Sequence, residues 1–248
     1  MIAALRKVWR RSRIFNYGFV ERDLWIAREA ARVPAGSRVL DVGAGVAPYR
    51  PLFAHCEYRT TDACPLQPHQ NRGGQPYGQI DYVCDVTAIP VPDASFDVVI
   101  CTEVLEHVPE PIKAIQEFGR IVRPGGLLLL SAPLSGYVHQ EPYHFYGGFS
   151  PYFYQKFLSE NGFTDIQVMQ NGGFFRHYGA QSVRLVNCLK PSVLTRNPLL
   201  QVLLYPLWIP LVLYLGILTP LIMHVLDPLD RSNMATAGYH VRARKCAS

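Results

Sequence analysis

Short apolar segments alternate with polar, helix-like stretches from residue 38 to about residue 170 of this chain. Segments rich in Val, Leu and Ile, bounded by turn residues, predict strands. The predicted strands cover residues 38–42, 58–61, 82–85, 96–101, 127–132 and 164–169. Strands that alternate with helices are typical of a parallel sheet with crossover helices on both faces.

Helical patterns occur before the first strand, near residues 20–32, and between later strands, near residues 111–122 and 151–161. Pro111 suits the first turn of the second of these helices. After the apolar segment that follows, residues 236–245 alternate apolar and polar side chains, which predicts a final strand. The fold class is therefore α/β, with an apolar insertion before the last strand.

The insertion is most apolar over residues 197–226, where only a protonated His224 could carry a charge and four prolines interrupt the pattern. As one helix, residues 199–226 would extend about 42 Å, which exceeds the ~30 Å hydrocarbon core of a bilayer. Hydropathy alone therefore predicts a transmembrane helix.

Topology opposes that interpretation. If residues 236–245 join the same sheet as residues 164–169, both ends of the insertion lie on one side of any membrane. A single span cannot do this, and two spans of ~20 residues each need more chain than residues 199–226 supply. We expect a proline-kinked helical hairpin that lies on or dips into a bilayer, with peripheral membrane contact through 199–226. A buried dimer interface and a lid over a hydrophobic substrate remain open alternatives.

Length and charge set the domain organisation. The 248 residues suffice for one α/β domain with an insertion, and the net charge is +5. We expect a basic N-terminal helical segment at 1–34 and one domain at 35–248, with the apolar helical insertion at 174–235. The first twenty residues hold five basic side chains and no acid. Such a segment can contact anionic lipid or nucleic acid, or it can form a solvated helix face.

No secretory signal pattern follows the basic residues. We expect a cytoplasmic protein, either free or peripheral on the cytoplasmic face of the membrane. The six cysteines form no Cys-x-x-Cys pair and no zinc-like spacing with histidine, so no metal site is predicted.

The chemistry begins at a glycine loop. The apolar run 39–42 contains Asp41 and ends in Gly43-x-Gly45. Glycine lets the backbone turn tightly and approach a ligand closely. A helix should follow and direct its free amide groups at that ligand. This pattern predicts the nucleotide-cofactor corner of a Rossmann-like sheet.

Acidic and polar residues follow the next strands at their carboxyl ends, where ligands bind in open α/β sheets. Asp62 lies at the end of the second predicted strand, 21 residues after Asp41, at the position where an acid grips a ribose diol. Asp85 ends the third strand, and Thr102-Glu103 follows the fourth. Together these residues predict one ligand site at a single edge of the sheet.

These motifs resemble class I S-adenosylmethionine-dependent methyltransferases, closest to the broad branch of small-molecule and quinone enzymes. The resemblance covers residues 36–170. The matching segments are Val39-Leu-Asp-Val-Gly-Ala-Gly45, Asp62, Cys84-Asp-Val86, Ser95–Ile100, Glu103-Val-Leu-Glu-His107 and Glu117-x-x-Arg-Ile-Val-Arg-Pro-Gly-Gly126. The resemblance implies S-adenosylmethionine as cofactor and a seven-stranded sheet whose last strand is antiparallel, a place that residues 236–245 would fill.

The resemblance also implies roles by position. Asp62 would hold the ribose, Asp85 the adenine amine, and Val86 would lie beside the ring. The methionine end would be bordered by Asp41, Gly43, Gly45, Thr102 and Glu103. One departure is Ala47, followed by Pro48, where the family places its third small residue. An NAD site is the competing interpretation, but position 48 is proline rather than glycine and no Tyr-x-x-x-Lys pair follows.

Methyl transfer to a hydroxyl is helped by a general base, and His144 and His107 are the candidates. His107 could instead be a structural helix-start residue. Tyr143 and Tyr146, in an aromatic segment after the fifth strand, would line the acceptor pocket or pack a lid. The apolar insertion favours a small or lipid-linked, membrane-associated acceptor and O-methylation.

Other functions stay open. The chain could be a catalytically inactive cofactor-binding scaffold in a membrane biosynthetic complex. Nucleic-acid methylation is not expected, because Cys-Thr-Glu-Val stands where an Asn/Asp-Pro-Pro-Tyr motif for base flipping would be. The acceptor, the methylated atom and the oligomeric state are left undetermined.

Overall fold

The computed structural model describes residues 11–247, which divide into two units. The sheet unit consists of Arg22–Met169 together with the chain from Gly238 onward. The second unit holds the described residues before Arg22 and the segment Gln170–Ala237. The N-terminal segment that we expect at 1–34 is thereby shared between both units, and its first ten residues, with three of the five basic side chains, lie outside the described part.

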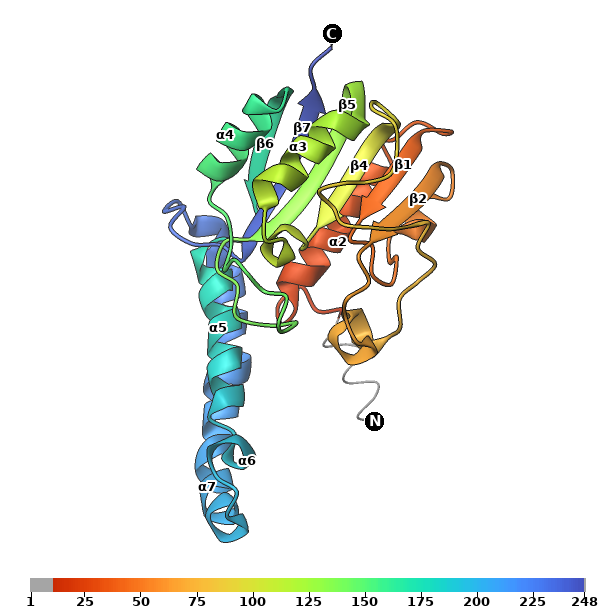
Figure 1. Cartoon of the computed structure of the whole chain (residues 1–248). Coiled ribbons are helices and arrows are strands. Elements are labelled where there is room, and N and C mark those ends of the chain that lie inside the picture. Colours follow the sequence, from red (N-terminus) through yellow and green to blue (C-terminus); the bar gives the residue numbers. More distant parts are fainter. Residues whose placement is uncertain (1–10, 248) are drawn as a thin grey trace. The chain divides into compact units, whose positions relative to one another are not determined.

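The sheet unit is built on seven strands in the order β3-β2-β1-β4-β5-β7-β6 (Figure 1). Strands β1 to β5 pair in parallel, and β7 pairs with β5 in the antiparallel direction. This confirms the predicted mostly parallel sheet with an antiparallel last strand. The bounds are β1 Arg38–Val42, β2 Glu57–Asp62, β3 Tyr82–Val83, β4 Phe96–Thr102, β5 Val122–Pro133, β6 Phe163–Gln170 and β7 Gly238–Lys245.

Helices cover both faces of the sheet, as the alternating pattern predicts. Helices α3 (Pro111–Ile121) and α4 (Pro151–Glu160) pack on one face, and the part of α2 (Tyr17–Ala30) from Arg22 onward packs on the other. Strand β5 serves both cores, because alternate side chains point to opposite faces. Leu128 and Leu130 join the core beneath α3 and α4, whereas Leu129 joins the core beneath α2.

The helix expected directly after the glycine loop does not form. The chain instead makes only a four-residue 3₁₀ helix, η1 (Arg50–Phe53). Pro51 lies in the first turn of η1, where proline is tolerated, but η1 ends at Phe53 and the chain re-enters the sheet as β2 at Glu57, which leaves no room for a longer helix. Strand β3 is also shorter than predicted, and β5 begins at Val122 with irregular pairing to β4 before Leu127.

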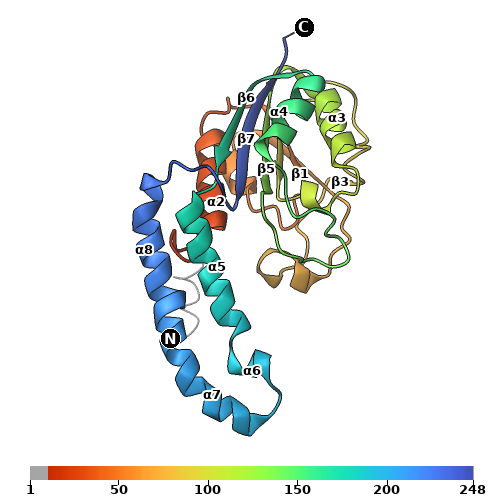
Figure 2. The ribbon, with the colours of Figure 1, turned by 90° about the vertical axis from the view of Figure 1, so that its left-hand side faces the viewer.

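The second unit is dominated by a helical segment, residues 174–229, which we call the helical arm. It contains α5 (Phe174–Cys188), the short α6 (Pro191–Leu194), α7 (Pro198–Leu211), a π-helical stretch η5 (Val212–Leu218), α8 (Thr219–Leu226) and η6 (Asp227–Leu229). Figure 2 shows α5 and α8 side by side, with α6 and α7 at the far end of the arm.

The arm is an antiparallel hairpin whose first leg is α5. At its base, the Asp227 carboxylate accepts hydrogen bonds from the backbone amides of Gly173 (3.1 Å) and Arg176 (3.0 Å). Midway, Ser182 Oγ donates to the Leu215 carbonyl at 2.8 Å, and further out Trp208 Nε1 donates to the Val186 carbonyl at 2.9 Å. Residue numbers increase along α5 while the numbers of their partners on the other leg decrease, so the two legs are antiparallel.

Residues 199–226 therefore form one leg of the hairpin and not a hairpin by themselves. Pro206 and Pro210 lie inside α7 without ending it, and the path continues through the π-helical stretch into α8. Within the described residues, Pro198–Leu229 is long and apolar enough to cross a membrane by length and composition, and only 17% of its most apolar window is buried.

Candidate cofactor and acceptor site

The glycine loop after β1 has three residues in the left-handed region. They are Gly43 (φ 66°), Gly45 (φ 55°) and Ala47 (φ 51°). At Gly43 an added Cβ would lie 2.3 Å from Val104 Cγ2, so only glycine fits. Ala47 takes the left-handed conformation that a third glycine would adopt at no cost. The departure noted in the sequence therefore preserves the backbone path of the loop.

Asp62, at the carboxyl end of β2, is tied to this loop. Its Oδ2 accepts from the Gly45 amide at 2.9 Å, and its Oδ1 accepts from the Cys64 amide at 2.8 Å. Burial raises the pKa of Asp62 above its usual range, although three backbone amides oppose that shift. Each carboxylate oxygen has a second lone pair, so Asp62 can still accept from a diol.

Asn71 adds a donor that sequence reasoning missed. Its side chain is 7% exposed, its Oδ1 lies 3.9 Å from where a Cβ on Gly45 would be, and its buried Nδ2 has no partner within the described residues. A buried amide without a partner is costly unless a ligand or water satisfies it. Asn71, Gly45 and Asp62 thus form a polar cradle that fits the ribose and methionine portions of a nucleoside cofactor.

Asp41 stabilises the loop from within the sheet. It is 2% exposed, and Tyr58 donates its hydroxyl to Asp41 Oδ2. Burial raises the pKa of Asp41 to about 7, and the charge of Asp62 adds to the effect. The structure therefore places Asp41 behind the loop, where it positions the end of β1.

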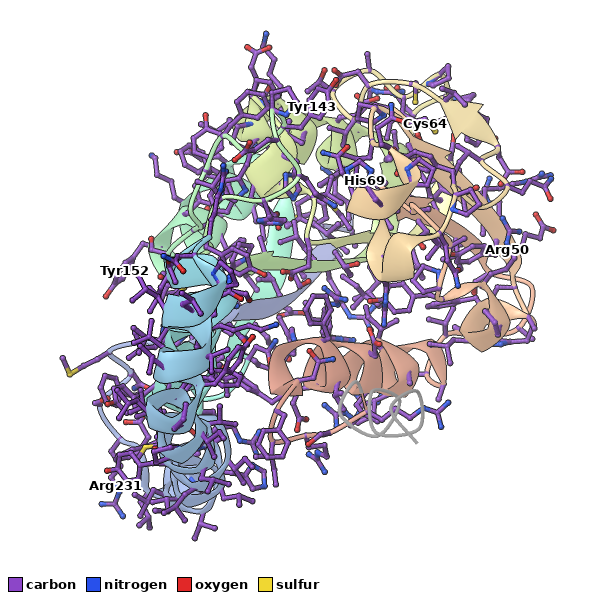
Figure 3. All side chains as sticks on the ribbon, turned by 90° about the horizontal axis from the view of Figure 1, so that it is seen from below. Arg50, Cys64, His69, Tyr143, Tyr152 and Arg231 are labelled. Carbon is purple, nitrogen blue, oxygen red and sulfur yellow. The ribbon has the colours of Figure 1, made fainter. Side chains whose placement is uncertain are left out.

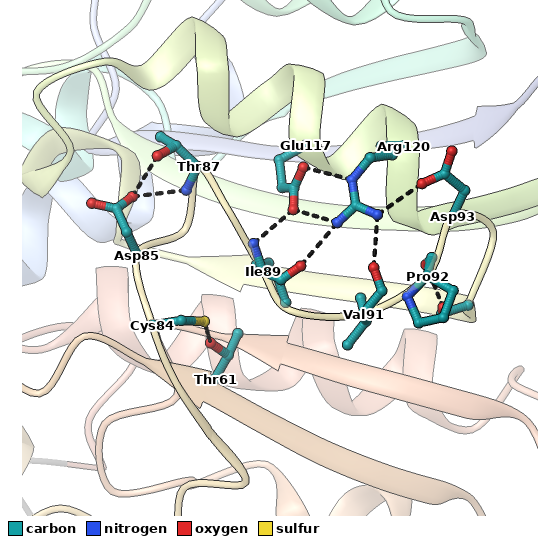
Figure 4. Close-up of polar contacts among 11 residues, drawn as sticks. Thr61, Cys84, Asp85, Thr87, Ile89, Val91, Pro92, Asp93, Glu117 and Arg120 are labelled. Atoms are coloured by element: carbon teal, nitrogen blue, oxygen red, sulfur yellow. Dashed lines mark hydrogen bonds and ion pairs between the residues drawn. The ribbon is translucent and has the colours of Figure 1, made fainter.

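The segment that carries Asp85 and Val86 is fixed by the Glu117-x-x-Arg120 motif (Figure 4). Glu117 Oε1 accepts from the Ile89 amide at 2.7 Å, and Arg120 donates to the carbonyls of Ile89 (2.9 Å) and Val91 (2.7 Å). Asp85 itself accepts from the Thr87 amide and hydroxyl through Oδ1. The sequence motif thus has a positioning role: it attaches the loop after β3 to α3.

The end of β4 presents Thr102 and Glu103 as expected, but Glu103 is already engaged. It has φ 54°, an uncommon conformation for a non-glycine residue. Ser131 Oγ donates to its carboxylate at 2.7 Å, and the buried Arg22 guanidinium lies 3.9 Å away. Arg22 also donates to the Tyr49 hydroxyl at 3.1 Å. Sequence reasoning missed Arg22, because a single arginine in an N-terminal helix carries no motif.

Two long connections meet at this edge of the sheet. Gln70, in the 3₁₀ helix η2 (Pro68–Gln70), donates to the Glu141 carbonyl at 2.8 Å, and Gln140 donates back to the Gln70 carbonyl at 3.1 Å. In Figure 3, His69 and Cys64 mark the first connection and Tyr143 marks the second. The connection after β5 is therefore held beside the one that carries Asn71.

Three histidines gather where the connection after β5 meets the 3₁₀ helix η4 (Leu105–His107). Nitrogens of His107, His139 and His144 lie within 4.8 Å of one another. The structure brings the two candidate bases together, with ring centroids 5.5 Å apart, and adds His139. Burial lowers the pKa of His107 to about 4 and also lowers the pKa of His144, so both imidazoles are neutral at pH 7.

The two aromatic candidates anchor this connection. The Tyr143 carbonyl accepts a hydrogen bond from His107 Nδ1, and the Tyr146 hydroxyl donates to the Pro109 carbonyl at 2.9 Å. The Phe145 and Tyr146 amides both donate to the Glu106 carbonyl. Tyr146 is 37% exposed, and its hydroxyl is used to hold the connection against the segment after η4.

A methyltransferase-domain family model matches residues 16–178. The match covers more than half of the chain, so the protein belongs to this methyltransferase family. The expectation of a class I S-adenosylmethionine-dependent methyltransferase, made from the loop and the strand ends, is confirmed.

Curated relatives match this chain over less than half of its length. An uncharacterized methyltransferase of Mycobacterium sp. (strain JLS) is 38% identical over 112 residues, 44% of this chain and 43% of its own length. A ubiquinone biosynthesis O-methyltransferase of Xanthomonas oryzae pv. oryzae (strain PXO99A) is 39% identical over 106 residues, 39% of this chain and 43% of its own length. These matches span less than half the length of either relative.

Solved structures share the fold at low identity. A putative sarcosine dimethylglycine methyltransferase from Galdieria sulphuraria has a TM-score of 0.54 at 16% identity, covering 93% of this chain and 86% of its own. A phosphoethanolamine N-methyltransferase 2 of Haemonchus contortus, solved with phosphomonomethylethanolamine and S-adenosylhomocysteine, has a TM-score of 0.53 at 16% identity, covering 97% of this chain and 57% of its own. These likenesses show the shared fold, whereas the match to the methyltransferase-domain family supports S-adenosylmethionine as the cofactor.

Proposed function

We propose that this protein transfers a methyl group from S-adenosylmethionine to a hydroxyl oxygen of a lipid-linked acceptor at the cytoplasmic face of a membrane. The observation that carries the proposal is the combination, in one chain, of a complete cofactor edge and an arm whose apolar side chains face outward. The match to a ubiquinone biosynthesis O-methyltransferase supports the choice of oxygen.

The cofactor edge would hold the methyl donor through groups from successive strand ends. Asp62 would accept from the ribose hydroxyls, and Asn71 Nδ2 would donate to the cofactor across the loop from Gly45. The neighbouring Asp85 and Val86 would border the adenine. Thr102 and Glu103 would border the methionine end, with Arg22 countering the charge of Glu103. S-adenosylmethionine supplies an activated sulfonium methyl, so the chain mainly has to align the acceptor and exclude water.

The acceptor hydroxyl would lose its proton at the three histidines, with His144 as the base. Its pKa below the ordinary histidine value keeps the ring neutral and able to accept a proton at pH 7. His144 Nδ1 is also buried without a partner in the described residues, so it has a free lone pair or hydrogen to use. Tyr143 would line the acceptor pocket through its ring, while His107 supports the connection.

The helical arm would bring the protein to the acceptor. Leu199, Leu203 and Leu207 are 75%, 68% and 67% exposed, which is costly for leucine in water. No acid occurs between residues 166 and 226, whereas the exposed Arg184, Lys190 and Arg196 are basic. An apolar surface flanked by basic residues favours an anionic bilayer, with the arm lying in the interface and its charges at the headgroups.

The test is a methyl-transfer assay with labelled S-adenosylmethionine and two phenols that share one aromatic head. One phenol carries a polyprenyl tail and is embedded in phosphatidylcholine/phosphatidylglycerol vesicles; the other has no tail and is dissolved. We expect label on oxygen of the tailed phenol and at least about tenfold slower transfer to the soluble one. Equal rates would contradict the lipid-linked acceptor.

The alternative of an inactive scaffold predicts a different result in the same assay. A scaffold would bind S-adenosylmethionine, measured by calorimetry, yet transfer no label to either phenol or to a membrane lipid extract. Transfer to nitrogen or carbon of the extract components would retain the methyltransferase and correct the O-methylation.

A further inference from the structure

The three histidines described above form a group that no sequence motif predicted. They come from two places in the chain: His107 ends η4, and His139 and His144 lie on the connection after β5. Their ring centroids are 4.8 Å (His107–His139), 5.5 Å (His107–His144) and 4.7 Å (His139–His144) apart. Within residues 11–247, this is the one group of three or more His, Cys, Asp or Glu side chains close enough to share a metal ion.

Two of the rings carry the hydrogen bond that metal-bound histidines commonly make. His107 Nδ1 donates to the Tyr143 carbonyl, and His139 Nδ1 donates to the Tyr137 carbonyl at 2.8 Å. A carbonyl oxygen can only accept, so each Nδ1 carries the proton and each Nε2 keeps its lone pair. Metal-bound histidines almost always donate their other nitrogen to a carbonyl or carboxylate in this way, which fixes the tautomer and the ring direction.

The third ring and a neighbouring carboxyl group each have a buried polar atom without a hydrogen-bond partner in the described residues, which a bound cation could satisfy. His144 Nδ1 is buried with no hydrogen bond in the described residues. Glu106 has a side chain only 1% exposed, its Oε1 lies 3.7 Å from His107 Nε2, and its Oε2 also has no partner there. The unpartnered nitrogen of His144 and the unpartnered oxygen of the buried Glu106, beside two imidazoles whose Nε2 lone pairs are available, suit a positive ion at this place.

We propose that His107, His139 and His144 bind one divalent transition-metal ion, with Zn²⁺ as the best fit. Imidazole nitrogen suits Zn²⁺ better than Mg²⁺ or Ca²⁺, which prefer oxygen. Three protein ligands with a fourth position open is the arrangement of catalytic zinc sites. Nitrogens bound tetrahedrally to zinc stand about 3.4 Å apart, so the rings need move inward by less than about 1 Å each.

The metal site gives the cluster a second way to ionise an acceptor. A metal-bound imidazole accepts no proton, whereas a hydroxyl bound at the open position would have a strongly lowered pKa and would release its proton to water. His144 as base therefore belongs to the metal-free protein, and coordination would replace it in the loaded one. Metal binding itself does not depend on the proposed acceptor.

The experiment uses the full chain without an affinity tag, stripped of metal by a chelator and titrated with Co²⁺ and Zn²⁺. Calorimetry gives stoichiometry and affinity, and the visible bands of Co²⁺ gain intensity when the ion becomes four- or five-coordinate. We expect one ion per chain. His139→Ala and His144→Ala should each weaken Zn²⁺ binding at least about 100-fold.

His69→Ala is the matched control, because His69 is exposed and outside the cluster. It should bind Zn²⁺ as the unmodified chain does. Affinity for S-adenosylmethionine, measured on each variant, verifies that the cofactor edge is folded. Absence of one-to-one binding, or equal affinity in the cluster variants and in His69→Ala, would overturn the site. Neither result depends on whether any phenol is methylated.

Discussion

The sheet unit and the helical arm use the same kinds of apolar residues in opposite ways. In the sheet unit, Leu128, Leu129 and Leu130 are fully buried in its two cores. In the arm, Leu203 and Leu207 are about two-thirds exposed. The sheet unit gathers the polar side chains of its candidate site at one edge, whereas the arm exposes apolar side chains from Leu199 to Leu229. Composition alone does not distinguish leucines that pack in a core from leucines that stay exposed. The difference depends on whether another element of the chain covers the face that carries them.

The two units also differ in the tasks that we assign to them, which are cofactor and acceptor binding for the sheet unit and membrane contact for the arm. The sheet unit holds the cofactor cradle and the histidine cluster, whose geometry depends on buried hydrogen bonds. The arm holds its own legs together through contacts such as Trp208 to Val186, and its exposed apolar surface is the part that we propose contacts a membrane. Substitutions in one unit should therefore leave the task of the other intact, and the following predictions test this.

The largest expected effect is on turnover. His144→Ala removes the proposed base, so methyl transfer to the tailed phenol should fall by about 10²- to 10⁴-fold. Affinity for S-adenosylmethionine and for vesicles should stay within about twofold, as measured by calorimetry and flotation. Turnover that is unchanged in metal-free protein would remove His144 as the base.

Asp41 should produce a pH-dependent stability difference in the sheet unit. Its folded-state pKa, raised by burial to about 7, lies above the ordinary value of 3.8. The stability that protonated Asp41 contributes to the folded state is therefore fully present below pH 3.8 and is lost as the pH rises through 7. At 1.36 kcal/mol per pKa unit, that interval corresponds to about 4 kcal/mol.

The measurement is the free energy of unfolding by urea at pH 5 and pH 8, for the unmodified chain and for Asp41→Asn. The variant should lose less stability between the two pH values, because asparagine accepts from Tyr58 without ionising. Glu57→Gln, an exposed change on the neighbouring strand, is the control. Parallel pH curves for Asp41→Asn and the unmodified chain would show that Asp41 does not keep its proton in the folded state.

Membrane contact should depend on the exposed leucines of the arm. Leu199→Glu, Leu203→Glu and Leu207→Glu together remove three apolar side chains that would enter the bilayer. They also place negative charges on the arm, which an anionic membrane surface repels. Partitioning into phosphatidylcholine/phosphatidylglycerol vesicles should weaken at least about 100-fold in flotation. Transfer to the dissolved phenol should be unaffected.

Val83→Glu and Tyr152→Glu are the matched controls, because both side chains are exposed apolar residues of the sheet unit. They should leave flotation unchanged. If the arm variant floats as before, the membrane role is wrong. If it loses self-association in sedimentation instead, the arm is an interface between copies of this chain.

The smallest effect is expected for Asp62. Asp62→Ala should weaken binding of S-adenosylmethionine at least about tenfold by calorimetry, because two hydrogen bonds to the ribose are lost. Asp165→Ala, an exposed acid on β6, is the control. An unaltered affinity in Asp62→Ala would place the cofactor elsewhere on the sheet.

Much of the fold could be predicted because its signals are local. The runs Val39–Val42 and Leu127–Leu130 have the composition of buried strands, and the acids after successive strands lie at one edge whenever the strands are parallel. The prediction of a helix after the glycine loop was wrong, because the chain returns to the sheet as β2 at Glu57 soon after η1 ends at Phe53.

The sequence by itself determined the class of fold, the glycine loop and the positions of Asp62, Asp85 and Thr102-Glu103, because each depends on residues near one another in the chain. Only the tertiary structure decided which distant side chains meet. His139 joins His107, Arg22 reaches Glu103, and Glu117-x-x-Arg120 proves to anchor the loop that carries Asp85. Likewise, residues 199–226 pair with α5 instead of folding on themselves, because the contacts of Asp227, Leu215 and Trp208 with that helix satisfy polar groups that a local hairpin would leave unpaired.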